Sequence, residues 1–159
     1  MLSEHRDIDL SVIDCKGCHQ ENFEEKKQSL LREIEKNIDL LGNPDILLTY
    51  RCPFIIPPTI FERVQIGAFN LHPSLLPKHK GSNPWEEIFR NHEQESGVTL
   101  HQLTKDIDSG TIVSQLKFTI ATSDNIESAR NKSDELAREL VKDFISNMDF
   151  PSVGTPKTS

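Results

Sequence analysis

The segment 70–81, Asn-Leu-His-Pro-Ser-Leu-Leu-Pro-Lys-His-Lys-Gly, most tightly constrains the fold of this chain. A largely apolar run at 64–69 leads into it and predicts a strand that ends near Asn70. Side chains two residues apart on a strand point to the same side, so we expect Asn70 and His72 to face one way. Two prolines then stiffen the exit from the strand. A rigid segment that presents an amide and an imidazole together is typical of a functional site.

Length and composition indicate one globular domain. The chain has 159 residues, enough for a sizeable core, and we expect a single domain at 1–150 followed by a polar tail at 151–159. The sequence contains no apolar run of membrane-spanning length and does not start with a signal-peptide core, so a cytoplasmic protein is expected. A net charge of −7 argues against broad nucleic-acid binding, because phosphate contacts need Lys and Arg.

The remaining periodicities predict alternating strands and helices. Short strand patterns occur at 8–13, 45–50, 65–71, 97–103 and 111–120. Helical patterns or helix starts lie between and after them, at 22–41, at 59–64, from residue 83 and from residue 124. The first two strands and their helix favour a parallel β-α-β unit, and the last two strands favour an antiparallel hairpin. We therefore expect the α/β class, with a mostly parallel sheet and an antiparallel C-terminal hairpin.

Three of the helices have recognisable start signals. Asn22 with Glu25 three residues later predicts a capped start, and Asp124 with Glu127 predicts another. Asn83 stands before a proline, a residue that suits the first helical position. These signals predict where each helix begins.

The three cysteines raise a separate question. Two of them lie in the segment Cys-Lys-Gly-Cys-His at 15–19, a spelling used for haem attachment and, more loosely, for half of a zinc site. Haem attachment belongs to exported proteins, and Cys52 is the one obvious further zinc donor. We therefore favour a loop with reduced thiols and expect no metal.

Three segments together resemble the folate-dependent formyltransferase family. They are Asn-Leu-His-Pro-Ser-Leu-Leu-Pro at 70–77, Gly-Val-Thr-Leu-His at 97–101 and Asp-Ile-Asp-Ser-Gly-Thr-Ile at 106–112. The family includes glycinamide ribonucleotide formyltransferase, methionyl-tRNA formyltransferase and amino-sugar N-formyltransferases. The resemblance covers roughly 45–120, and the flanks agree in element order.

The resemblance implies that Asn70, His72 and Asp108 are the catalytic residues of an N-formyltransferase. Such an enzyme moves a formyl group from the cosubstrate 10-formyltetrahydrofolate to a primary amine. We expect the Asn70 amide and a protonated His72 to donate hydrogen bonds to the developing oxyanion, each stabilising it by about 3 kcal/mol. Asp108 is expected to orient His72 and to raise its pKa, or to accept a proton from the amine. The reaction needs no covalent enzyme intermediate.

Folate binding is also implied by the resemblance. In relatives, backbone groups of the segment that matches 53–56 hold the pterin, together with the turn before Asp108. Phe54 and Ile56 are the positions carried over to this chain.

The other histidines near these motifs are expected to have ordinary roles. His101 is taken as a packing residue of a strand, and His79 as a solvated residue of a basic loop. The run Lys78-His79-Lys80 could meet a phosphate on the acceptor, but a solvated loop is an equal alternative.

The chain departs from the family at its start. Family members begin with a strand and a glycine-rich turn, then a helix and a strand, before the element that matches 8–13. The resemblance therefore implies a truncated Rossmann-like three-layer α/β/α fold. It also implies an exposed sheet edge, which a homo-oligomer could cover.

Two functional hypotheses remain open at this stage. The first is an active N-formyltransferase for a small, phosphorylated or nucleotide-linked amine, such as glycinamide ribonucleotide or an amino sugar. The second is a shortened relative, inactive or hydrolysing formyltetrahydrofolate. Formylation of tRNA is less favoured than either, because the charge is negative and the domain that follows the catalytic one in methionyl-tRNA formyltransferases is missing.

Overall fold

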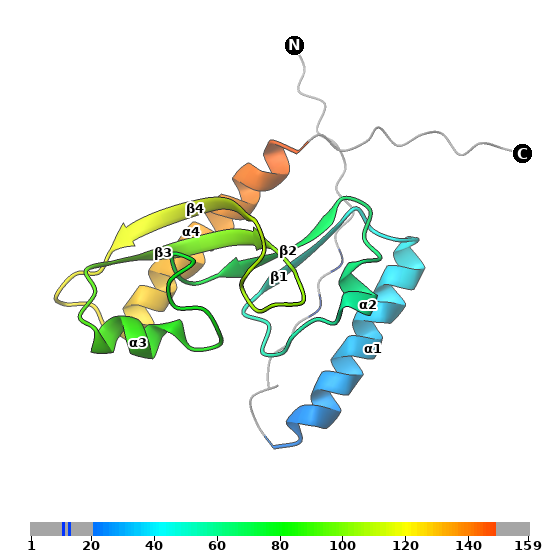
Figure 1. The fold of residues 1–159 in the computed structure, drawn as a ribbon, viewed down its shortest axis with the longest axis horizontal. Helices are drawn as coiled ribbons and strands as arrows, with labels where there is room; N and C mark the ends of the chain where they lie inside the picture. Colours follow the sequence, from blue (N-terminus) through cyan, green and yellow to red (C-terminus); the bar gives the residue numbers. More distant parts are fainter. Residues whose placement is uncertain (1–10, 12, 14–20, 149–159) are drawn as a thin grey trace, which may run out of the picture.

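The computed structural model describes residues 11, 13 and 21–148 (Figure 1). Within this part the element order is α1 (Phe23–Leu41), β1 (Ile46–Tyr50), α2 (Pro58–Phe61), β2 (Gly67–His72), α3 (Pro84–Arg90), β3 (Glu95–Gln102), β4 (Ile112–Thr119) and α4 (Ile126–Ser146). Each of these elements overlaps a predicted one, so the α/β class is confirmed. Among the described residues, no helix has both the length and the apolar composition needed to cross a bilayer.

Several predictions concern other parts of the chain. The strand at 8–13 lies outside the described residues except for Ser11 and Ile13, which belong to no regular element. The cysteine-containing segment at 15–19 and the tail at 151–159 also lie outside them.

The described strands form one mixed sheet in the order β1-β2-β3-β4. β1 and β2 are parallel, whereas the β2–β3 and β3–β4 pairs are antiparallel. The predicted C-terminal hairpin is confirmed, but the expectation of a mostly parallel sheet is wrong for these strands. The connection at 73–94 contains one short helix, α3 of seven residues. It stays at the end of the sheet where β2 leaves, and β3 therefore runs antiparallel to β2.

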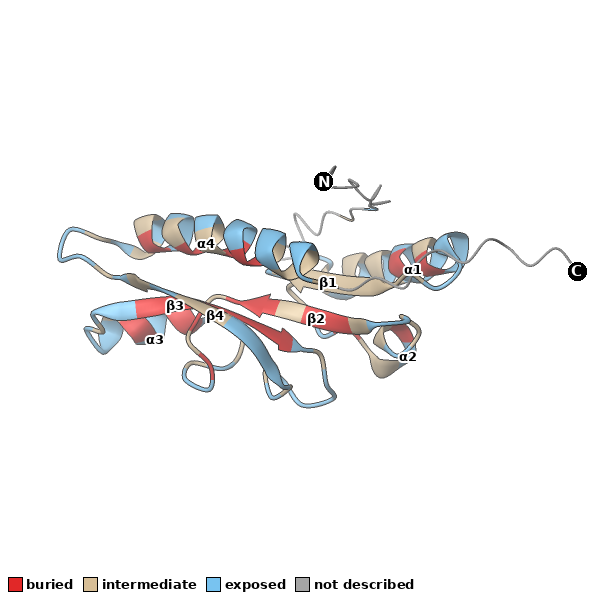
Figure 2. Cartoon of the chain, turned by 90° about the horizontal axis from the view of Figure 1, so that it is seen from above, coloured by how far each residue is buried: buried red, intermediate tan, exposed pale blue. Residues whose placement is uncertain are grey.

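Helix α4 covers one face of the sheet, and α3 lies on the other side (Figure 2). Alternate residues of β2 and β3 pack against α4 in a continuous apolar cluster formed by Phe69, Leu71, Val98, Leu100, Ala137 and Leu140. Because successive strand side chains alternate between the faces, Asn70 and His72 point to the face opposite α4. The core thus determines which face presents the polar groups.

Helix α1 packs at the β1 end of the sheet. Its Ile34 and Ile38 form a second buried cluster with Ile56 and with Ile60 of α2. The helix predicted at 22–41 therefore turns Ile34 and Ile38 toward the core.

The helix starts differ in detail from the predicted caps. Asn22 is the N-cap of α1, but it adopts a left-handed conformation and its side chain makes no capping hydrogen bond. The cap of α4 is Asn125, not Asp124, and it forms a reciprocal capping box with Ser128. Asp124 instead accepts a hydrogen bond from the Ala121 amide at 2.7 Å. A turn that uses Asp124 locally leaves the next residue to cap the helix.

Gly97 packs closely against β4 and against the loop after β2. A Cβ at this position would lie 2.1 Å from the Leu116 carbonyl oxygen and 2.5 Å from Leu75 Cδ2. We expect Gly97→Ala to lower the free energy of unfolding by about 3 kcal/mol, because the backbone of β4 must move. Urea denaturation measures this loss.

Gly42→Ala is the matched control. Gly42 has φ +66°, and a Cβ there would meet nothing within 4 Å. Only the backbone cost of about 1 kcal/mol is expected. A loss for Gly97→Ala no greater than that for Gly42→Ala would contradict the packing account.

Candidate active site

The antiparallel pairing of β2 with β3 builds one side of the site. Asn70 lies opposite His101, and His72 lies opposite Thr99. The Asn70 amide is held at both ends, because its Oδ1 accepts a hydrogen bond from the Thr49 hydroxyl at 2.8 Å and its Nδ2 lies 3.2 Å from His101 Nε2. The amide orientation is therefore set by the neighbouring strands.

His72 is buried, and both of its ring nitrogens have partners. Nε2 lies 2.7 Å from the His79 carbonyl oxygen. A carbonyl can only accept, so Nε2 carries a proton. Nδ1 lies 3.3 Å from Asp108 Oδ2. This arrangement leaves Nδ1 as the nitrogen whose protonation can change.

Asp108 reaches the site from the turn between β3 and β4. Its φ of +48° is in the left-handed region, which Asp tolerates better than most residues. Oδ2 accepts a hydrogen bond from the Gly81 amide at 2.8 Å, and Oδ1 lies 3.4 Å from His101 Nε2. Asn70, His72 and Asp108 thus lie in one contact network although Asp108 is distant in sequence.

His101 completes this network, and the expectation that it only packs is wrong. Its ring is almost fully buried and touches both Asn70 and Asp108. A signal for this was present in the sequence, since Gly97, Thr99 and His101 share one face of a predicted strand. Only the register of β3 against β2 makes that face the same as the face of Asn70.

Electrostatics at the site favour a neutral His72 and an ionised Asp108. Burial lowers the pKa of His72, and this effect exceeds the opposing influence of the Asp108 carboxylate and the His79 carbonyl. Burial by itself raises the pKa of Asp108. Contacts with His101, the Gly81 amide and His72 lower the pKa by more, so the net pKa lies below its ordinary value. Asp108 raises the pKa of His72, as predicted, but desolvation of the ring lowers it by more, so the protonated His72 that we expected is not the favoured form.

Side chains of β3 and β4 form hydrogen bonds with the loop that follows β2. The Thr99 hydroxyl donates to the Ser74 carbonyl at 2.7 Å and accepts from the Leu76 amide at 3.1 Å. Gln115 Nε2 donates to the Leu76 carbonyl at 2.8 Å. The Leu76–Pro77 peptide bond is cis. These contacts hold the loop rigidly beside His72.

Two loops meet over the site. Lys80 Nζ donates to the Ser109 hydroxyl at 3.0 Å, and Gly81 binds Asp108 as described. Lys80 of the basic run 78–80 therefore has a hydrogen-bond partner within the chain.

His79 is not solvated as predicted, because its side chain is only 8% exposed and is paired with two glutamates.

The two positions carried over for folate binding lie at the edge of the second core cluster. Ile56 is buried in that cluster, and Phe54 packs against it. Their side chains therefore contribute to the core, while Ile55 between them is 59% exposed.

Comparisons with known proteins agree with this geometry. A family model described as formyl transferase matches residues 4–145. Methionyl-tRNA formyltransferase of Thermotoga neapolitana is 30% identical over 107 residues, which make up 67% of this chain and 34% of that protein. The corresponding enzyme of Kosmotoga olearia is 31% identical over 105 residues and is also covered over 34% of its length. The chain therefore spans about a third of the curated relatives it matches.

Solved structures show the same fold. Phosphoribosylglycinamide formyltransferase of Coxiella burnetii aligns with a TM-score of 0.63 and 26% identity, over 76% of this chain and 56% of that chain. A Mycobacterium tuberculosis protein described as a candidate sugar N-formyltransferase aligns with a TM-score of 0.60 and 25% identity, over 70% of this chain and 47% of that chain. Because the family match extends over most of the sequence and includes the whole polar network, the chain belongs to the formyltransferase family.

Proposed function

We propose that this chain carries the reaction site of an N-formyltransferase, with 10-formyltetrahydrofolate as donor and a primary amine of a small metabolite as acceptor. Members of the family use this formyl donor. The observation that carries the proposal is the network of Asn70, His72 and Asp108 on one sheet face, with Asn70 and Asp108 joined through His101. Formyl transfer needs hydrogen-bond donors for an oxyanion and a group that moves a proton, and these residue types supply both.

The Asn70 amide is suited to stabilise the oxyanion. When the amine attacks the formyl carbon, negative charge grows on the formyl oxygen. The Thr49 hydroxyl binds the amide oxygen of Asn70, and the amide nitrogen lies 3.2 Å from His101 Nε2. The second N–H of this nitrogen is the donor we assign to the oxyanion. An amide held in advance costs no reorganisation during the reaction, which makes each such donor effective.

His72 is suited to move the proton. Because Nε2–H is engaged by the His79 carbonyl, Nδ1 is the nitrogen that accepts the proton lost by the attacking amine. Asp108 then stabilises the charged ring. The same proton is returned to the folate nitrogen as its bond to the formyl carbon breaks. A lowered pKa of His72 fits this order, because the ring starts neutral and able to accept.

Folate is proposed to bind beside this network, between the backbone of 53–56 and the turn that carries Asp108. The segment around Phe54 and Ile56 follows β1, which is parallel to β2, so both strands end at the same edge of the sheet. Ligands of open α/β sheets bind at that edge.

A small amine is the acceptor we favour. Solved relatives include proteins named for glycinamide ribonucleotide and for sugars. The curated relatives act by name on methionyl-tRNA, whereas this chain carries a net charge of −7. Contacts to tRNA phosphates depend on Lys and Arg, so a negative chain is a poor tRNA partner.

The first test is formyl transfer by the wild type and by three variants. We expect Asn70→Ala, His72→Ala and Asp108→Ala each to lower kcat by roughly a hundredfold or more, the usual loss of one oxyanion donor or proton-transfer group. Glycinamide ribonucleotide, an amino sugar nucleotide and methionyl-tRNA serve as acceptors. A reaction without amine measures hydrolysis of the donor, which would support the hydrolytic alternative.

His92→Ala is the control in this assay, because His92 is an exposed histidine beyond the network. Titration with a folate analogue is read in parallel. Absence of folate binding, or equal rates in His72→Ala and the wild type, would overturn the proposal.

The pH dependence of stability tests the electrostatic account. Burial lowers the pKa of His72 from its ordinary value of 6.5. Below pH 6.5 the His72 ring of the unfolded chain therefore binds a proton more readily than the ring of the folded chain. Stability should therefore fall as the pH drops from about 7 to about 5. The lowered pKa of Asp108 acts only at lower pH. We expect His72→Gln to show a smaller fall than the wild type, measured by urea denaturation at both pH values.

The matched control for that measurement is His92→Gln, which also removes one histidine. It should retain the wild-type fall in stability. An identical fall in His72→Gln and in the wild type would contradict the lowered pKa of His72.

A further inference from the structure

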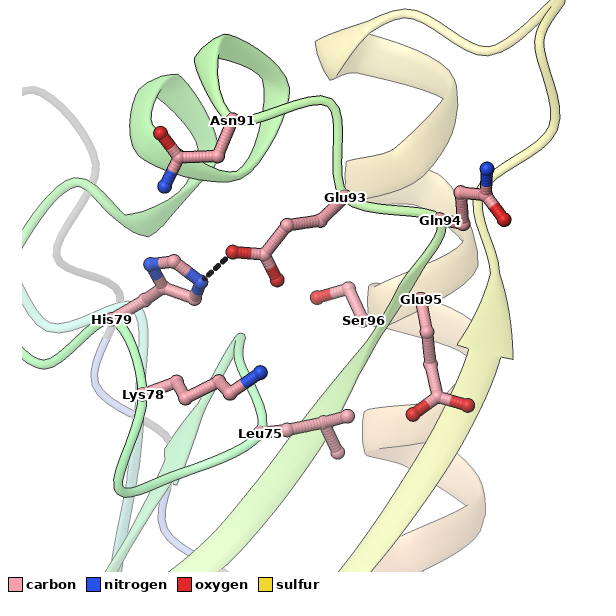
Figure 3. A pocket seen from close by; sticks show the side chains of 8 residues that line it. All are labelled: Leu75, Lys78, His79, Asn91, Glu93, Gln94, Glu95 and Ser96. Carbon is pink, nitrogen blue, oxygen red and sulfur yellow. Dashed lines mark hydrogen bonds and ion pairs between the residues drawn. The ribbon is translucent and has the colours of Figure 1, made fainter.

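The side chain of His79 lies between two carboxylates. Nδ1 is 2.9 Å from Glu87 Oε2, and Nε2 is 2.6 Å from Glu93 Oε1. Glu87 belongs to α3, and Glu93 lies in the connection between α3 and β3. Figure 3 shows the His79 ring in direct contact with Glu93, and both residues line a cavity of about 440 Å³. We call these three residues the His79 clamp.

The clamp engages both nitrogens of the ring, one with each carboxylate. The contact with His79 lowers the pKa of Glu87 below its ordinary value. Lys78 and Glu95 are the other charged residues that line the cavity. The ring is thereby fixed although it belongs to a loop.

The backbone of the same residue touches the proposed active site. The His79 carbonyl accepts the proton of His72 Nε2 at 2.7 Å. His79 has φ +54°, a conformation that few side chains adopt without support. The side chain of His79 is held by two contacts, and its backbone adopts an unusual conformation. The His79 carbonyl group therefore has little freedom to move.

We propose that His79 is a positioning residue, whose clamp by Glu87 and Glu93 holds the backbone carbonyl that selects the Nε2–H tautomer of His72. The relevance of this tautomer to catalysis rests on the proposed function, because it leaves Nδ1 free for proton transfer beside Asp108. The clamp links α3 to His72 through His79.

The test uses the full chain labelled with 15N and has a readout that needs no substrate. A ring N–H donated to a buried carbonyl exchanges slowly with water, so the His72 Nε2–H signal should be observable in the wild type. Its assignment comes from its loss in His72→Gln. In His79→Asn, which tolerates the positive φ but is too short to bridge both glutamates, we expect exchange at least about tenfold faster.

Glu87→Gln and Glu93→Gln, singly and together, remove the charge of the clamp and keep its shape. The single Glu87→Gln variant protects the test against misfolding, because the Glu87 side chain is 48% exposed. Glu86→Gln is the matched control, since it removes a neighbouring exposed carboxylate of α3 that is not in the clamp. We expect faster exchange in the clamp variants and wild-type exchange in Glu86→Gln.

Kinetics give the second readout. If the clamp positions His72, kcat for formyl transfer should fall by about tenfold in His79→Asn with little change in KM, because misplacing a reacting group slows the chemical step. Unchanged exchange of the His72 ring proton in His79→Asn and in the Glu87→Gln variant would overturn the inference. Absence of formyl transfer in the wild type would overturn the proposed function, while the exchange measurement would still decide the clamp.

Discussion

The antiparallel register of β2 on β3 is the constraint on which the site depends. It places Asn70 opposite His101 and His72 opposite Thr99. A slip of one residue would send these side chains into the apolar layer under α4, where Phe69 and Leu71 now lie. Burial of the large apolar residues on one face therefore fixes the register that keeps the polar residues on the other face. Packing of the core and assembly of the site are consequences of the same pairing.

Burial then determines how the assembled groups ionise. His72 and His101 are almost completely buried, and Asp108 is largely covered by the Gly81 amide and the histidine rings. Desolvation of a ring favours its neutral form, whereas hydrogen bonds to a carboxylate favour its charged form. His72 and Asp108 therefore form a pair of a neutral base and an anion. In the proposed reaction, such a pair is suited to accept a proton and to release it again.

Much of the fold could be predicted from local pattern. Short strand patterns predicted β2, β3 and β4, and a helical pattern at 22–41 predicted α1. The caps were less accurate, because Asp124 and Asn125 can each cap a helix and only the turn at Ala121 decides between them. The direction of β3 could not be inferred, since it depends on the length of α3 and on where the connection packs. The direction of the pKa shift of His72 was also missed, because it depends on how deeply the ring is buried.

The sequence by itself determined the identities and the strand phase of Asn70 and His72, because a period of two residues follows from the backbone of any strand. It also contained the motifs on which the family resemblance rests. Only the tertiary structure decided that His101 joins Asn70 to Asp108, and that His79 is buried between Glu87 and Glu93 instead of solvated. These contacts join residues from different strands, loops and a helix. Their distances depend on register and packing, which no local pattern of residues specifies.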